Sequence, residues 1–205
     1  DTNGNNAVQK ALYETNNEMS NLYSKFMKEI IIPFIGEKYY IQKTPTNRFS
    51  FPFSKGMTER DFHNDIMLGH PPEEINVWVP FTDTAKSRSF SILPLSWSLY
   101  LLNKYDNNLA DLHSAIWNDD DLFATIQDNA NIVGMKPGEV LIFDSRCLHA
   151  ATLNMSEYTR VSMDIRVISS DDYEQLPFKY IGTGRRKVQF IPGDFYNHIP
   201  CRIDI

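Results

Sequence analysis

The sequence contains only two cysteines, Cys147 and Cys201, among its 205 residues. Two thiols so far apart in the chain do not form the dense disulfide framework that stabilises small secreted domains. The sequence therefore excludes that class of protein and favours a reducing, cytoplasmic setting.

The chain also lacks long hydrophobic runs and an excess of positive charge. Its longest apolar stretches, such as residues 30–35 on either side of Pro33, fall far short of the roughly 20 residues that span a bilayer. Its net charge of -6 gives no general attraction to nucleic-acid phosphates or anionic lipids. We therefore expect no membrane segment and no nucleic-acid partner. The sequence leaves open the oligomeric state and what precedes Asp1.

Internal repeats, low-complexity tracts and linkers rich in glycine and serine are absent as well. A length of 205 residues suits one domain, since domains usually take roughly 100 to 200 residues. The 42% hydrophobic and 22% charged contents are typical of a folded globular chain. A single domain over residues 1–205 is the simplest expectation.

The pattern of apolar residues divides this domain into helical and extended parts. Apolar residues recur at helical spacing over residues 7–31, and Pro33 is expected to end that helix. A long helical or irregular insertion is expected between residues 95 and 131, with a helix at 109–117. Short apolar runs bounded by turn residues predict strands at residues 48–53, 75–81, 90–93, 140–143 and 159–168.

Helices first and antiparallel strands afterwards predict a mainly β fold. We expect a double-stranded β-helix core (a jelly roll, cupin-like) buttressed by N-terminal and inserted α-helices. In this interpretation residues 1–45 form a helical buttress, residues 46–168 the jelly-roll core, and residues 169–205 a C-terminal extension.

Two histidines and an aspartate form a candidate metal site. In an extended chain His63 and Asp65 leave the same face about 6 to 7 Å apart, close enough to bind one ion. Alone, this motif is weak and more typical of a surface turn than of a metal site. His149 follows a Pro-Gly turn and the apolar strand at 140–143, although a buried histidine without a chemical role is the alternative there. Two histidines and one carboxylate can occupy one face of a mononuclear iron site, which favours an oxygenase.

An arginine downstream offers a partner for a carboxylate. Residues 160, 162, 164 and 166 alternate with the apolar residues 161, 163, 165 and 167, so a strand here has one polar and one apolar face. That polar face could simply be exposed to solvent. If Arg160 lies inside a barrel instead, its guanidinium needs a carboxylate, which it can bind through two parallel hydrogen bonds. The distal carboxylate of 2-oxoglutarate meets that need.

Taken together, these motifs resemble the Fe(II)- and 2-oxoglutarate-dependent dioxygenases of the phytanoyl-CoA dioxygenase superfamily. The resemblance covers roughly residues 48–167, with a weaker similarity at 190–196. The motif at 63–65 followed by residues 69–83 is similar to the small bacterial branch associated with antibiotic and sugar biosynthesis. The resemblance implies His63, Asp65 and His149 as the iron ligands, Asn154 as a turn asparagine and Arg160 as the 2-oxoglutarate ligand.

The resemblance also implies an activity: hydroxylation of a small-molecule metabolite with Fe(II), 2-oxoglutarate and O2, releasing succinate and CO2. Asp65 favours hydroxylation, desaturation or epimerisation, because related halogenases carry a small residue in its place. Ala151 departs from the pattern, since many relatives have a serine there that assists the cosubstrate carboxylate, and another hydroxyl could take over. The spacing of Arg160 and Arg166 also resembles an arginine pair of nucleic-acid demethylases, which makes Arg166 the alternative cosubstrate ligand.

Several further residues are weaker candidates. Asn76 could contact the cosubstrate and Arg48 could line the pocket mouth, whereas Arg166, His70 and Trp78 could contact substrate. Each has a plain structural alternative on a solvent-facing strand or loop.

Cys147 and residues 182–187 are not expected to take part in chemistry. Cys147 shares a strand face with His149, but a thiolate beside an oxygen-activating iron would be oxidised, so a small apolar filler is the better interpretation. Residues 182–187 join glycines to three cations without the spacing of a phosphate-binding loop.

Two other functions stay open. One is a metal-binding jelly roll that binds a small molecule without turnover, because this fold hosts many functions. The other is a nucleic-acid demethylase, which the acidity of the chain disfavours. The sequence does not identify the substrate.

Overall fold

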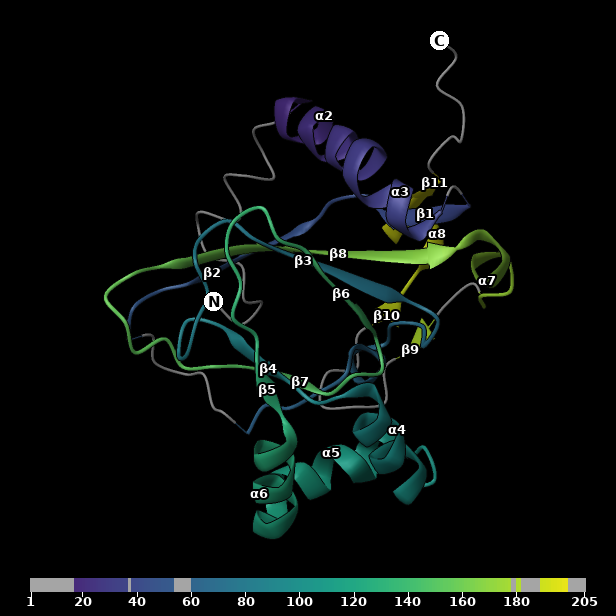
Figure 1. The fold of residues 1–205 in the computed structure, drawn as a ribbon. Helices are drawn as coiled ribbons and strands as arrows, with labels where there is room; N and C mark the ends of the chain where they lie inside the picture. The colour runs from purple at the N-terminus through teal and green to yellow at the C-terminus, as the bar shows by residue number, and fades with distance from the viewer. Residues whose placement is uncertain (1–16, 37, 54–59, 178–179, 182–188, 199–205) are drawn as a thin grey trace.

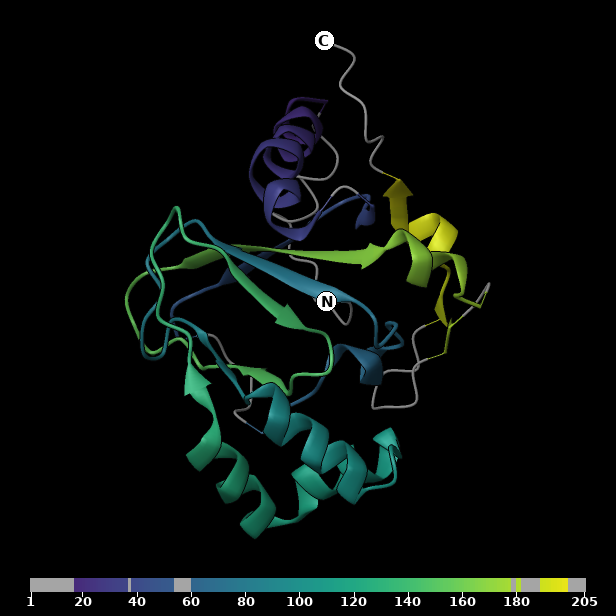
Figure 2. The same ribbon diagram turned by 45° about the vertical axis from the view of Figure 1, so that its right-hand side comes forward.

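The computed structural model describes residues 17–36, 38–53, 60–177, 180–181 and 189–198 of the chain. Two antiparallel sheets face each other, and helices cover their outer sides (Figure 1). In the view turned by 45°, the N-terminal helices again lie on the outer side of the large sheet, and the inserted helices lie on the outer side of the small sheet (Figure 2). This arrangement confirms the predicted mainly β jelly-roll core with helical buttresses.

The large sheet is organised around its longest strand, β8. Its path runs β11-β1-β8-β3-β6, and β2 pairs with the first half of β8 while β1 pairs with the end of β8. All of these pairings are antiparallel. The strands are β1 (Tyr39–Gln42), β2 (Thr46–Ser50), β3 (Ile75–Pro80), β6 (Leu141–Asp144), β8 (Arg160–Ser169) and β11 (Tyr196–His198).

The small sheet lies opposite and has the order β5-β4-β7. A separate two-stranded ladder joins β9 to β10. The strands are β4 (Phe90–Ile92), β5 (Asn131–Ile132), β7 (His149–Ala151), β9 (Tyr180–Ile181) and β10 (Gln189–Phe190). All five strands predicted from the sequence are present, with each end within three residues of the prediction. The other strands, each of two to four residues, escaped prediction because such short segments carry little periodicity; they are β1, β5, β7, β9, β10 and β11.

The two faces of β8 separate the apolar core from a polar interior. The apolar face, with Met163, Ile165 and Val167, packs against the N-terminal helix in a cluster that includes Met27 and Ile31. The polar face, which could have been exposed to solvent, instead points between the sheets. Arg160, Ser162 and Arg166 on that face are all buried.

The N-terminal helix continues past the proline that was expected to end it. It runs through α2 (Asn17–Phe26), the π-helical turn η1 (Met27–Ile31) and α3 (Ile32–Ile35), with Pro33 in the first turn of α3. A proline is tolerated in a first turn, where its missing N–H would be unsatisfied anyway, and the wider π turn before it starts a new segment. The expected end at Pro33 was therefore wrong. Residues 7–16 of the predicted helix lie outside the described residues.

The insertion between the strands forms three helices, α4 (Leu95–Lys104), α5 (Leu109–Asn118) and α6 (Asp120–Asn129). Asn108 and Asp119 accept hydrogen bonds from the first turns of α5 and α6, which satisfies backbone N–H groups that otherwise lack partners. The apolar sides of these helices pack against the outer face of the small sheet. The insertion is therefore an ordered layer of the fold.

Short elements complete the chain: η2 (Asp65–Leu68), α7 (Ser170–Glu174) and α8 (Pro192–Phe195). Among the described residues, none of the helices combines the length and the apolarity that crossing a bilayer requires.

Replacing Ile165 with alanine tests the packing of β8 on the N-terminal helix. Ile165 has no exposed surface, and removing a buried isoleucine side chain leaves a cavity. We expect the free energy of unfolding to fall by about 2 to 5 kcal/mol in denaturant titrations. Ile142→Ala on β6 is the control, because Ile142 is 41% exposed, and its cost should be about 1 kcal/mol or less. Equal losses in the two variants would contradict this packing.

Candidate metal centre

His63 and His149 are brought together by their own backbones. The His63 N–H donates to the His149 carbonyl at 3.0 Å, and the His149 N–H donates back to the His63 carbonyl at 2.8 Å. Residues that exchange both bonds in this way face each other directly across an antiparallel bridge. Their imidazole ring centroids consequently lie 4.7 Å apart.

Asn64 sets the position of Asp65. Its backbone is extended, as the sequence analysis assumed, and its side chain accepts a hydrogen bond from the Met67 N–H at 3.2 Å, which begins the short helix η2. The Asp65 N–H donates to the Ser145 carbonyl at 3.1 Å. Gly69 ends the turn with a φ of 95°, a conformation that glycine adopts without strain.

The donor atoms of His63, Asp65 and His149 all lie within 4.8 Å of one another. His149 Nε2 is 4.0 Å from Asp65 Oδ1. His63 Nδ1 lies 2.8 Å from the Asp61 carbonyl oxygen, and His149 Nδ1 lies 3.0 Å from the Cys147 carbonyl oxygen. Because a carbonyl can only accept, each Nδ1 carries the proton, and each Nε2 keeps its lone pair for a metal.

The protonation states of His63 and Asp65 also suit metal binding. Burial first, and then the neighbouring His149, lowers the pKa of His63 to about 4, so its imidazole is neutral near pH 7. Burial alone would raise the pKa of Asp65, but Arg166, with smaller effects of His149 and His70, holds that pKa well below its usual range. A neutral imidazole and an ionised carboxylate are the forms that bind metals.

The set of donors fits a ferrous ion. Two imidazoles and one carboxylate form the facial triad that leaves coordination positions open in non-haem iron oxygenases. Cys147 is not part of the group. Burial raises the pKa of its thiol to about 11, so it stays protonated and makes a poor ligand. This agrees with its interpretation as a filler.

Two side chains from the large sheet hold the Asp65 carboxylate. Asn76 Nδ2 donates to Oδ2 at 2.8 Å. Arg166 donates through Nε to Oδ2 at 3.2 Å and through Nη2 to Oδ1 at 3.1 Å. Asn76 and Arg166 face each other across β3 and β8, so both point into the interior. The structure thus places these two candidates against the aspartate of the triad.

Glu74 extends this cluster and was missed by the sequence analysis. Its side chain is fully buried, accepts a hydrogen bond from the Tyr196 hydroxyl and lies 3.8 Å from Arg166 Nε. His70 Nδ1 is 3.1 Å from a Glu74 carboxylate oxygen, and the His70 ring packs edge-on against Phe195. Little in the sequence indicates this burial, because a Glu-Glu pair before a strand is typical of a solvated turn.

Arg160 lies further along the same interior face of β8. It is 5% exposed, and its Nη1 donates to the Ser89 carbonyl at 2.9 Å, whereas its Nε has no hydrogen-bond partner among the described residues. Burial, against the opposing effect of Asp164 and with a smaller effect of nearby Arg48, lowers the pKa of Arg160 to about 10. Ser162 Oγ is also buried and without a partner in the described part of the chain.

The remaining candidates surround this polar face. The Arg48 side chain is 49% exposed and forms an ion pair with Asp164 at the rim. Trp78 is buried between the sheets, where its ring packs edge-on against Phe90. Phe90 and Phe143 also pack edge-on against the His149 ring. The histidine therefore lies against an apolar wall.

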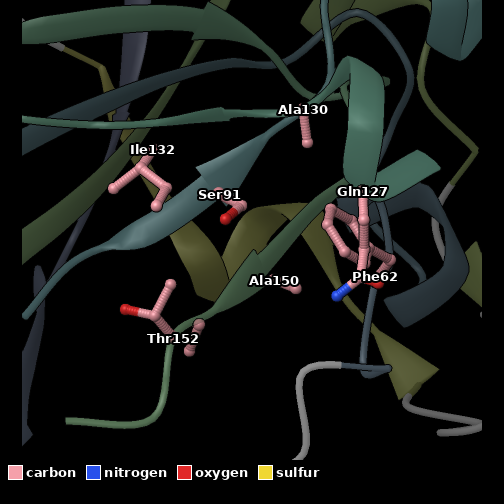
Figure 3. Close-up of a pocket in the computed structure, with 8 residues that line it drawn as sticks. Phe62, Ser91, Gln127, Ala130, Ile132, Ala150 and Thr152 are labelled. Carbon is pink, nitrogen blue, oxygen red and sulfur yellow. The ribbon is translucent and has the colours of Figure 1, made fainter. Parts of the chain in front are cut away.

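A cavity of about 230 Å³ lies close by but on the other side of the small sheet. Ser91 and Ala150 pair across β4 and β7, so their side chains share the face opposite to that of His149 (Figure 3). None of the three donors borders this cavity. Its lining consists of Phe62, Ser91, Gln127, Ala130, Ile132, Ala150, Ala151 and Thr152.

Comparison with known families gives one match that covers most of the chain. The family described as Phytanoyl-CoA dioxygenase (PhyH) matches residues 2–162. Among curated proteins, the Streptomyces griseus streptomycin biosynthesis protein StrG is 27% identical over 161 residues. That alignment covers 78% of this chain and 60% of StrG, so the chain spans well under two thirds of this relative.

Solved structures share the fold at low sequence identity. The non-heme alpha ketoglutarate dependent carbocyclase SnoK from nogalamycin biosynthesis superposes with a TM-score of 0.55 at 15% identity, over 84% of this chain and 64% of SnoK. The epimerase SnoN of the same biosynthesis gives a TM-score of 0.51 at 14% identity, over 78% of this chain and 59% of SnoN. At this level of identity the similarity concerns the fold alone.

Divalent metal should stabilise the protein through the three donors. Because a ligand that binds only the folded state stabilises it, adding Co(II) at about 100 times its Kd should raise the free energy of unfolding by about 2.7 kcal/mol. His149→Ala should lose this effect, as followed by the thermal unfolding midpoint with and without metal. His113→Ala, on the distant helix α5, is the control and should keep it. Loss of the effect in both variants would contradict the assigned site.

Proposed function

Because the chain belongs to the phytanoyl-CoA dioxygenase (PhyH) family, we propose that it is a non-haem Fe(II)- and 2-oxoglutarate-dependent oxygenase. Its most direct reaction is the hydroxylation of a small-molecule metabolite. The convergence of His63, Asp65 and His149 within 4.8 Å carries this proposal. The three residues come from two distant parts of the sequence, and a buried group of this composition has no structural need to assemble.

In the proposed site His63 Nε2, His149 Nε2 and Asp65 Oδ1 would hold the iron. A bound ferrous ion would supply the activation of O2, with 2-oxoglutarate as the two-electron reductant. The overall reaction inserts one oxygen atom of O2 into a C–H bond of the substrate and the other into succinate, and the C1 carboxylate of 2-oxoglutarate leaves as CO2. The chain must position the target C–H bond and exclude water from the centre.

Arg160 is the group proposed to bind the distal carboxylate of 2-oxoglutarate. Its guanidinium is buried, and its Nε is without a partner among the described residues. Burying an incompletely paired cation is costly, and an incoming carboxylate would remove that cost through two parallel hydrogen bonds. Arg166 suits this role less well, because its guanidinium already binds Asp65 through two hydrogen bonds.

Ser162 is proposed to supply the hydroxyl that Ala151 cannot. Ser162 lies two residues after Arg160 on the same face of β8, and its buried Oγ has no partner in the described residues. A hydroxyl in this place can donate to the carboxylate that Arg160 binds. Ser162 on β8 of the large sheet would thereby compensate for the departure at Ala151 on β7 of the small sheet.

A small molecule is the proposed substrate class. The family assignment and the fold shared with enzymes of nogalamycin biosynthesis support it. His70 and Trp78 are less suited to substrate contact than the sequence suggested, since His70 binds Glu74 and Trp78 is buried between the sheets. The apolar wall of Phe90 and Phe143 beside His149 suits the exclusion of water.

Iron-dependent turnover tests the proposal directly. Purified protein with Fe(II), 2-oxoglutarate and O2 should form succinate, slowly without substrate and faster with a true substrate from a metabolite panel. His63→Ala or Asp65→Ala should lower succinate formation by at least about 100-fold, because each removes an iron ligand. Succinate is measured by mass spectrometry, with His113→Ala as the active control. Normal turnover in the ligand variants would overturn the assignment.

The cosubstrate site makes a separate prediction. Arg160→Met should raise the 2-oxoglutarate KM by about 10- to 100-fold, since losing a charge-assisted pair costs about 1.5 to 3 kcal/mol. Ser162→Ala should raise it by about 2- to 10-fold, in keeping with the loss of one hydrogen bond from an uncharged donor. Arg48→Met, on the exposed rim, is the control and should change the KM little. An unchanged KM in Arg160→Met would exclude this arginine.

A further inference from the structure

Arg166 and Glu74 form a buried pair next to the candidate metal centre that neither the family match nor the proposed reaction explains. The family match ends at residue 162, before Arg166. Both side chains are inside the protein, with Arg166 6% exposed and Glu74 1% exposed. Buried charges are costly unless they have specific partners. The placement of Arg166 and Glu74 beside Asp65 therefore suggests that the two residues have a role at the metal centre.

The hydrogen bonds to Asp65 leave only one place for a metal. A carboxylate offers about two lone pairs on each oxygen. Oδ2 accepts from both Asn76 Nδ2 and Arg166 Nε, so both of its positions are used. Oδ1 accepts only from Arg166 Nη2 among the described residues and faces His149 Nε2 at 4.0 Å. One lone pair on Oδ1 is left, on the side of the histidines.

Glu74 in turn holds the guanidinium. Its carboxylate lies 3.8 Å from Arg166 Nε, and it is itself bound by the Tyr196 hydroxyl and by His70. The guanidinium is charged at any ordinary pH and lies between two buried carboxylates, those of Asp65 and Glu74. Rotation of the guanidinium away from them would therefore leave both carboxylates without their arginine partner.

From this geometry we infer that Arg166 is a positioning residue that restricts Asp65 to one-oxygen ligation through Oδ1, and that Glu74 anchors Arg166 in this role. The inference rests on the metal centre of the proposed function. The restriction matters because a two-oxygen aspartate would occupy a further coordination position, which the cosubstrate and O2 need. A neighbouring cation also makes Asp65 a weaker donor, which is the cost of the arrangement.

Measuring metal affinity without cosubstrate or O2 separates the effect of the Arg166 charge from its effect on the orientation of Asp65. Arg166→Met removes a positive charge beside the site, and electrostatics alone predicts tighter binding of a divalent ion. Loss of orientation predicts the opposite, with the Kd for Co(II) or Mn(II) rising about 10- to 100-fold. Arg166→Lys keeps the charge but not the two-pronged geometry and should lie between the wild type and Arg166→Met. The Kd is measured by anaerobic calorimetry.

The visible absorption of bound Co(II) provides a readout that a merely structural role would not move. Its d–d bands depend on coordination number, so a switch of Asp65 to two-oxygen ligation in Arg166→Met should change their intensity and position. Arg160→Met is the matched control, because it removes a second buried arginine from the same face of β8. It should keep the Co(II) spectrum and the metal Kd while it loses 2-oxoglutarate affinity.

Each outcome decides the inference. Arg166→Met leaves the buried carboxylates of Asp65 and Glu74 without their arginine partner and could fail to fold, so the charge-balanced double variant Glu74→Gln with Arg166→Met serves as its replacement. Unchanged or tighter metal binding with an unchanged Co(II) spectrum in a folded variant overturns the inference and leaves the oxygenase proposal intact. The same holds if Arg166→Met loses only 2-oxoglutarate affinity. A wild-type protein that binds no divalent metal overturns both.

Discussion

The reciprocal backbone hydrogen bonds between His63 and His149 are the constraint on which the candidate site depends. They join a loop at the start of the core to strand β7, and they place two imidazoles on one face without any help from the side chains. The carbonyls of Asp61 and Cys147 then fix both Nδ1 protons, so the free nitrogens point toward Asp65. The positions of the two histidine side chains are thus set mainly by hydrogen bonds of the backbone, which is the stiffest part of the fold.

The large sheet contributes the buried arginines that lie near the candidate metal centre. Between residues 160 and 167, strand β8 alternates between a polar face that points between the sheets and an apolar face that packs on the N-terminal helix. Along that polar face Arg160 remains incompletely paired, whereas Arg166 is fully engaged by Asp65 and Glu74. Two arginines that look equivalent in the sequence therefore differ in their availability to a ligand. This difference, more than their spacing, supports assigning them separate roles.

The proposed oxygenase chemistry and the stability of the fold make opposite demands on this interior. Folding favours pairing every buried charge, but a cosubstrate site needs a cation whose partner is supplied by the ligand. The apolar walls around His149 and the packed helices outside both sheets provide the stable surroundings in which one such group can persist. Among the buried side-chain atoms that lack a hydrogen-bond partner in the described residues, Arg160 Nε and Ser162 Oγ lie on the same face of β8, which is consistent with a ligand site there.

The sequence by itself determined the mainly β class, the five principal strands and the three residues of the candidate triad. Those features depend on local periodicity and on short motifs, which a chain displays directly. It did not determine the course of the helix past Pro33, the strands β1 and β7, or the roles of Asn76, Arg166 and Glu74. These depend on which segments become neighbours. Glu74 is 1% exposed and lies against Arg166 and Tyr196, which come from distant positions, as well as against the nearby His70, and no local pattern encodes the two distant contacts.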